Sequence, residues 1–588
     1  MKITTWLTQL VGEQFEANGV DAKFGVVRKS DRPDLGQFQC NGALAAAKEV
    51  KQNPRELGQK IVDQLASNPL FSLVTIAGPG FINLTLSDEV LVEKIEHLRS
   101  DDRLGYPAVA DPESILVDYG GANVAKPMHV GHLRAAIIGE SLKRLAKFIG
   151  HEVLGDVHLG DWGLQMGMLI AEMEERNPDL PYFDETHSGP YPEESPVTID
   201  ELAEIYPTAS AKAKESIAML ARSRKATQAL QDGHAGYTAL WQHFVNVSVA
   251  ELKTDYAELN VDFDLWLGES DTREIMPQMI TDLEQQGHAV PSEDALIIDV
   301  SKEDDNRDLP PLILRKSDGA VLYGSTDLAT IVQRVRDYSP DRILYVVDRR
   351  QSDHFLQVYR AAYKTGIAPE SMELTHVDFG TMNGKDGRPF KTRSGGTMRL
   401  RALLEMVYDA ATQKLDEAEY AKDLDPDERT RVSEIVGVAA LKFADLSNHR
   451  SKNYVFDLDK FFSFEGRTGP YLLYSTVRAS SILGRAAKEG FVPGPLLPPA
   501  SEAERSLMLM LLELPDAIDK AFDEYVPHPL CEYAYELANS YNRFNHEHYV
   551  MSEPNKKQQA SWLAMTELFI KVETQVLDLL GIDVPKRM

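Results

Sequence analysis

Two histidines in the string His129-Val130-Gly131-His132 are the residues whose types and spacing most clearly point to chemistry. They follow a short apolar run at 115–119 and precede a helical pattern that Gly150 closes. A loop between a strand and a helix N-terminus favours phosphate, because free N–H groups and the helix dipole meet there. Imidazoles in such a loop can stabilise charge that develops at an α-phosphate. Chance placement of two histidines is the alternative for an isolated motif of this kind.

A second segment, residues 379–400, reads FGTMNGKDGRPFKTRSGGTMRL. Its Gly-rich loop offers Lys385, Lys391, Arg393 and Ser394 to phosphates. A solvated cationic turn is the structural alternative.

The elements that must position these loops fall into three regions. Residues 1–108 are predicted to form a small α/β module, and 109–402 alternate β-rich runs such as ILVDY, ALIIDV and RILYVV with helical segments. That alternation predicts a parallel, Rossmann-like sheet with crossover helices. A helical insertion is expected at about 176–260. Residues 403–588 are predicted to be all-helical, with a Pro- and Gly-rich loop at 490–499.

Composition narrows the class of protein. The chain has 588 residues, a formal net charge of −29 and two cysteines without ligand-like spacing. This argues against a disulfide framework, a cysteine zinc site and nonspecific coating of nucleic acid. A local basic surface can still bind RNA. The N-terminus lacks a signal pattern and no apolar run approaches the ~18 residues of a membrane span, so a cytoplasmic protein is expected.

Several strings together resemble one family. HVGH resembles the HIGH signature of class I aminoacyl-tRNA synthetases, and NVAKPMHVGHLR and HEVLGDVHLGDWGLQMG are similar to the arginyl branch. Residues 391–395, KTRSG, resemble a degenerate KMSKS loop. GPGFIN resembles the N-terminal module of the arginyl branch, and LANSYNRFNHEHYVM and LLGIDVPKRM resemble its final helices. The chain is therefore identified as a member of the arginyl-tRNA synthetase family, with the resemblance covering essentially its whole length.

The resemblance implies a fold, a reaction and a site. The fold would be a class I catalytic domain between an N-terminal tRNA-binding module and a helical anticodon-binding domain. The reaction would join arginine to its tRNA with ATP as substrate and Mg²⁺ on the ATP phosphates, without a structural metal. The implied catalytic residues are Lys126, His129, His132 and Lys391. The implied ATP-binding residues are His129, Gly131, His132, Lys391, Arg393 and Ser394. Because this loop has one lysine where KMSKS has two, Lys126 is expected to share the stabilisation of the phosphates.

The amino-acid pocket is implied in the same way. A guanidinium is best recognised by carboxylates in a fork geometry. The implied arginine-binding residues are Asp118, Asn123, His132, Tyr323, Asp327 and Gln351. Taken singly, each is more often a cap or a surface group.

The helical region supplies candidates for tRNA contacts. Tyr541, Phe544 and Tyr549 could stack on unpaired anticodon bases, and Arg450 and Lys452 could contact phosphates. Core packing of the aromatic residues and ordinary surface charge are the alternatives. The family resemblance also suggests a monomer.

Two other functions compete with this hypothesis. HxGH loops also occur in nucleotidyltransferases that act on smaller acceptors, but such an enzyme would not need the helical C-terminal region. A noncatalytic RNA-binding relative could keep the fold, although it would have no reason to retain Lys126, His129 and His132.

Overall fold

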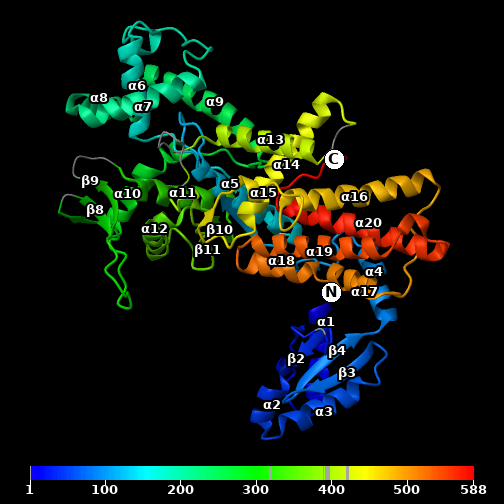
Figure 1. The fold of residues 1–588 in the computed structure, drawn as a ribbon. Coiled ribbons are helices and arrows are strands. Elements are labelled where there is room, and N and C mark those ends of the chain that lie inside the picture. Colours follow the sequence, from blue (N-terminus) through cyan, green and yellow to red (C-terminus); the bar gives the residue numbers. More distant parts are fainter. Residues whose placement is uncertain are drawn as a thin grey trace.

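The computed structural model describes residues 2–32, 34–293, 295–316, 321–388, 390, 398–418 and 423–588. Figure 1 shows three parts: a blue N-terminal module, a central part that contains a parallel sheet, and a bundle of orange and red helices from the end of the chain. The bundle lies between the N-terminal module and the central part. In the described part of the chain, no helix combines the length and the apolar character needed to cross a membrane.

The N-terminal module is a four-stranded antiparallel sheet packed against helices. The strand order is β1-β2-β4-β3. Its elements are α1 (Ile3–Ala17), β1 (Val27–Lys29), β2 (Phe38–Cys40), α2 (Ala43–Val50), α3 (Pro54–Leu65), β3 (Phe71–Ala77), β4 (Phe81–Leu86) and α4 (Asp88–Ser100). Leu7, Val11 and Phe15 bury one face of α1 in the core of the module. Lys2 pairs with Asp519 of the helical bundle, and Arg505 pairs with Asp88.

The central part contains the predicted parallel sheet, in the order β11-β10-β5-β6. The strands are β5 (Ser114–Asp118), β6 (Glu152–Asp156), β10 (Arg342–Tyr345) and β11 (Glu373–His376). Leu116 packs in one core and Val117 in another, so both faces of β5 are buried. The carboxyl ends of all four strands meet at one edge, which is where ligands bind in open sheets of this type.

Helices connect these strands. They are α5 (Val130–Ile149), α6 (Leu164–Arg176), α10 (Met276–Gln285), α11 (Tyr323–Tyr338) and α12 (Ser352–Lys364). Gly150 adopts φ 114° directly after α5 and closes it, as the sequence predicts.

The prediction that the run ALIIDV belongs to the parallel sheet was wrong. The run ALIIDV forms β8 (Ala295–Ile298), which lies in a separate antiparallel sheet of order β7-β8-β9 and not in the parallel one. The neighbours of β8 are β7 (Val290–Ser292) and β9 (Leu312–Lys316). No helix follows β8 before β9. Without a crossover helix, consecutive strands pair antiparallel.

Residues between α6 and α10 form the predicted helices of the insertion. They are η2 (Pro181–Phe183), α7 (Ile199–Glu215), α8 (Ile217–Gln231) and α9 (Ala235–Glu258). In Figure 1 these helices stand at the top of the molecule, away from the N-terminal module. A short helix, η3 (Glu269–Thr272), follows them.

The C-terminal region is helical, as predicted. Its helices are α13 (Leu400–Glu417), α14 (Pro426–Leu446), α15 (Leu458–Phe461), α16 (Gly469–Lys488), α17 (Glu502–Leu511), α18 (Leu514–Asp523), α19 (His528–Glu547), η5 (Val550–Ser552) and α20 (Lys556–Leu579). The predicted loop at 490–499 separates α16 from α17. A two-residue parallel pair, β12 (Met382–Asn383) with β13 (Tyr454–Val455), joins this region to the central part. The cores of the two parts form one continuous apolar cluster.

Candidate active site

The two signature histidines are held by backbone hydrogen bonds at the N-terminus of α5. The backbone N–H of Gly131 donates to His129 Nδ1 over 3.0 Å, and the N–H of His129 donates to His132 Nδ1 over 3.2 Å. The rings stack with centroids 3.9 Å apart. Because each Nδ1 accepts a hydrogen bond, the proton of each neutral ring resides on Nε2. The loop therefore presents two Nε2–H donors.

The surroundings keep both rings uncharged. Burial lowers the pKa of His129, and the nearby Lys126 ammonium lowers it further. Burial, with the neighbouring His129 and Lys126, lowers the pKa of His132 to about 3. Both imidazoles are therefore neutral donors near pH 7.

The second signature loop is anchored beside the first. The N–H of Val130 donates to the carbonyl of Met398 over 3.1 Å, and the N–H of Leu400 donates to Met128 over 2.9 Å. The residues implied for this loop, Lys391, Arg393 and Ser394, lie outside the described residues. The segment that leaves the loop is thus fixed next to His129.

The start of the same loop is tied to α5 by a residue that the sequence analysis missed. Arg134 is 2% exposed and donates to the carbonyl of Gly380 over 2.7 Å. It also forms a buried ion pair of 2.9 Å with Asp445 of α14 and donates to the carbonyl of Lys452. Arg134 therefore joins the histidine helix, the segment that leads into the second signature loop, and the helical region. A single arginine beside a signature carries no sequence signal for such a role.

Lys126 lies just before the histidines, after Ala125, which adopts φ 61°. Its ammonium is 4.7 Å from the centroid of the Tyr206 ring, which belongs to α7 of the insertion. Lys385, on the other loop, pairs with Asp457 over 3.2 Å. Lys126 is thus placed beside the histidines and in contact with the insertion.

Asp118 is the last residue of β5 and Asn123 lies in the loop after it, but their surroundings differ. Asp118 is 8% exposed, and its carboxylate accepts a hydrogen bond from Arg334 over 2.6 Å. Arg334 also donates to Asp156 at the end of β6, so this ion pair links two strand ends. Asn123 lies against Gly160, where an added Cβ would be 2.5 Å from the side-chain oxygen of Asn123. As placed, Asp118 already has a guanidinium partner within the protein.

Three other residues that were predicted to bind arginine lie near the starts of α11 and α12. Tyr323 begins α11 and is 69% exposed, and Gln351 is exposed directly before α12. Asp327 lies one turn after Tyr323 and accepts a hydrogen bond from Nε2 of His354. This bond raises the pKa of His354. The sequence analysis missed His354, although its position three residues after Gln351 was a usable signal.

A third missed residue is Glu269 in η3. Burial, with the charges of Asp161 and Asp327, raises the pKa of Glu269 to about 7. The pKa of Tyr323 is also raised, by burial and by the charges of Glu269 and Asp327. Glu269 therefore belongs to the surroundings of Asp327. In a chain with 91 acidic residues, one glutamate carries no signal in the sequence.

The predicted tRNA-contact residues separate into buried and exposed groups. Tyr541 is fully buried and stacks on Phe569 at 4.0 Å, and Phe544 is also fully buried. In this conformation neither ring offers a face to an RNA base, which favours the core alternative. Tyr549 is 75% exposed and does offer its ring. The two predicted phosphate contacts also differ. Arg450 pairs with Asp378 over 2.7 Å, whereas Lys452 is exposed.

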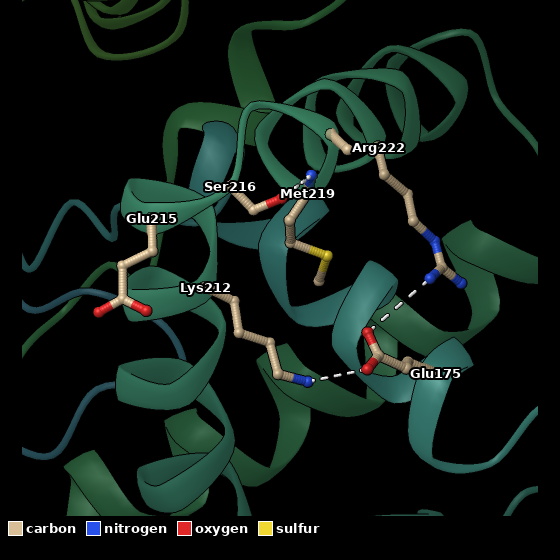
Figure 2. A pocket seen from close by; sticks show the side chains of 7 residues that line it. Glu175, Lys212, Glu215, Ser216, Met219 and Arg222 are labelled. Carbon is tan, nitrogen blue, oxygen red and sulfur yellow. Dashed lines mark hydrogen bonds and ion pairs between the residues drawn. The ribbon is translucent and has the colours of Figure 1, made fainter.

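A cavity of about 430 Å³ lies away from these residues, in the insertion. Figure 2 shows Glu175 between Lys212 and Arg222, with Ser216 and Met219 on the opposite side. The carboxylate of Glu175 is 3.0 Å from Lys212 and 3.9 Å from Arg222, so this carboxylate and both cations of the cavity are already paired. We therefore do not assign it to arginine.

Comparisons with known proteins agree with this geometry. Residues 94–458 match the family model of the catalytic domain of class I tRNA synthetases, the arginine type. Crystal structures of arginyl-tRNA synthetases from Plasmodium falciparum (TM-score 0.79, 24% identity, 100% of this chain and 98% of that one) and Thermus thermophilus (TM-score 0.78, 23% identity, 100% of both) share the fold. The fold and site define a class I aminoacyl-tRNA synthetase.

The particular branch follows from the full-length relatives. Residues 2–86 match the arginyl tRNA synthetase N-terminal domain, and 472–588 match the DALR anticodon binding domain. The arginine–tRNA ligase of Alkaliphilus oremlandii is 51% identical over 583 residues, covering 99% of both chains. That of Maricaulis maris is 48% identical over 587 residues, covering 100% of both. The chain belongs to the arginyl-tRNA synthetase family.

Proposed function

We propose that this protein ligates arginine to its tRNA in two steps. The arginine carboxylate attacks the α-phosphate of ATP, so pyrophosphate leaves and arginyl-adenylate forms. A hydroxyl of the 3′-terminal ribose of the tRNA, expected to be the 2′ one, then attacks the carbonyl carbon and AMP leaves. The observation that carries this proposal is the pair of neutral Nε2–H imidazoles at the N-terminus of α5, at the carboxyl edge of the parallel sheet.

On the nucleotide side, His129 and His132 would donate to the phosphate oxygens as negative charge develops. Lys126 and Lys391 would supply cations, and Mg²⁺ would enter with the ATP phosphates. Gly131, Arg393 and Ser394 complete the proposed ATP contacts. A Cβ at residue 131 would be 2.8 Å from the ring of His129, which explains the glycine.

On the amino-acid side, the guanidinium would bind Asp327, Tyr323 and Glu269. Asn123, Gln351 and His132 would contact the backbone groups of arginine. Asp118 would act within its pair with Arg334, since that pair occupies the carboxylate.

The helical region would bind the anticodon arm. Tyr549 is the aromatic residue with a free ring face, Lys452 is the exposed cation, and Arg450, Tyr541 and Phe544 remain weaker candidates. We propose a monomer that acts in the cytoplasm. Its proposed domain limits are 1–108, 109–402 with the insertion at about 176–260, and 403–588.

The test is ATP–pyrophosphate exchange with each of the twenty amino acids, with and without total bacterial tRNA. Exchange with arginine alone, and only in the presence of tRNA, would support the enzyme, its substrate and its dependence on tRNA together. Exchange with another amino acid would refute the arginine pocket. No exchange with any amino acid would favour a noncatalytic RNA-binding protein.

A further inference from the structure

His354 contacts the carboxylate that is proposed to hold the guanidinium. Its Nε2 hydrogen-bonds Oδ2 of Asp327, and both side chains are 30% exposed. The pair is therefore accessible to a ligand. A carboxylate only accepts, so Nε2 carries its proton whether the ring is neutral or charged.

The two protonation states of His354 have opposite effects on an incoming cation. A neutral ring orients Asp327 and leaves its negative charge available. A protonated ring forms an ion pair with Asp327, neutralises that charge and repels a guanidinium beside it. The same hydrogen bond is compatible with both states, so the switch needs no movement of the chain.

From this contact we propose that His354 is a positioning residue that couples arginine binding to the release of one proton. The inference rests on the proposed function, because it takes arginine as the ligand of Asp327. By linkage, a ligand that binds the deprotonated form more tightly must expel the proton, and its affinity rises with pH.

Among the described residues, Asp327 is the charged group that a hydrogen bond joins to His354. The hydrogen bond to Asp327 is the leading cause that raises the pKa of His354, with burial acting against it. Several other charged or titratable groups on the elements around α12 have partners elsewhere: Asp353 with Arg307, Arg349 with Asp378, Arg350 with Asp348, Arg315 with Glu284, His376 with the carbonyl of Val347, and Tyr345 with Arg334.

Asp327 has a second titratable neighbour, Glu269. The pKa of Glu269 is raised to about 7, with Asp327 among the causes, and its deprotonation would also favour a guanidinium. Tyr359 and Tyr323 are likewise perturbed by Asp327, but their raised pKa values keep them neutral near pH 7. The affinity of the wild type for arginine should therefore depend on two protons, one from His354 and one from Glu269.

A pair of substitutions separates the two states of the ring. His354→Gln keeps a neutral N–H donor, and His354→Lys keeps a permanent positive charge. His97→Gln, at an exposed position of α4, is the matched control. Isothermal titration with L-arginine at pH 6 and pH 8, in buffers of different ionisation enthalpy, gives both the Kd and the number of protons released.

We expect the wild type and His97→Gln to bind arginine more tightly at pH 8 than at pH 6. Each linked proton changes the Kd by at most about tenfold per pH unit. His354→Gln should bind arginine well at pH 6 and release up to one proton fewer than the wild type on binding. Its Kd should keep only the smaller pH dependence that Glu269 causes. His354→Lys should bind weakly at both pH values.

Two results would overturn the inference. The first is a His354→Gln protein that releases as many protons as the wild type, which a merely structural histidine would give. The second is a His354→Lys protein that binds like the wild type at pH 8. A wild type that binds no arginine at either pH would overturn the proposed function as well, so the two failures are distinguishable.

Discussion

The nucleotide side and the arginine side of the candidate site are held in different ways. On the nucleotide side, backbone N–H groups fix both histidine rings, and buried Arg134 fixes the adjoining segments. On the arginine side, the carboxylates pair with side chains of the protein itself: Asp118 with Arg334 and Asp327 with His354. The donors of the first side are therefore preorganised. On the second side, arginine bound as we propose would have to share or exchange these partners.

Removing the anchor of the nucleotide side should have the largest effect. Arg134→Ala leaves Asp445 buried without its partner, which costs about 3–5 kcal/mol of folding free energy. The midpoint of urea unfolding should fall and the KM for ATP should rise. Arg543→Ala, which breaks an exposed i,i+4 pair, is the control and should cost only about 0.3–0.5 kcal/mol. Equal losses in both variants would contradict a special role for Arg134.

Removing a donor at the histidine loop should come next. His129→Ala should lower kcat of pyrophosphate exchange by about 10²–10³-fold, equivalent to about 2.7–4 kcal/mol, because a preorganised donor to the developing charge is lost. The KM for arginine should change much less than kcat. His97→Ala should leave both constants unchanged. If the loss in His129→Ala fell on the KM for arginine instead, the two sides of the site would not be separate.

On the arginine side, Asp327→Asn should cost about 1.5–3 kcal/mol in kcat/KM for arginine, the usual range for a hydrogen bond to a charged group. Steady-state kinetics should place most of that loss in KM. Asp353→Asn, at an exposed carboxylate on the next helix that pairs with Arg307, is the matched control. A similar loss in both variants would remove Asp327 from the pocket.

The smallest effect is the pH dependence of stability due to His132. Its pKa is about 3 in the folded protein against an ordinary value of 6.5, so the unfolded chain binds the proton more readily between those values. Stability therefore falls as pH drops below about 6.5, by at most about 1.4 kcal/mol per pH unit. The free energy of unfolding, measured with urea at pH 7, 6 and 5, should fall less steeply with decreasing pH for His132→Gln than for the wild type. An unchanged pH dependence of stability would mean that the imidazole ring of His132 is solvated in the folded protein.

The candidate site was only partly predictable. The HVGH loop was predicted from its motif, and Lys126, Asn123, Tyr323, Asp327 and Gln351 were implied by the resemblance to the family. Arg134, Glu269, Arg334 and His354 were not predicted, because each is a single common residue whose partner lies on another element. The ion pair of Arg334 with Asp118, for example, joins residues 216 positions apart. The buried rings of Tyr541 and Phe544 show the same limit, since periodicity predicts a helix but not which face the neighbouring helices cover.

By itself, the sequence determined the strand-loop-helix around His129, the end of α5 at Gly150 and the helical character of the C-terminal region. These depend on hydrogen bonds and side chains a few residues apart, which local patterns record. Only the tertiary structure decided that ALIIDV leaves the parallel sheet, that Arg134 joins three segments and that His354 faces Asp327. Those outcomes depend on which distant surfaces pack together and which buried charges must find a partner.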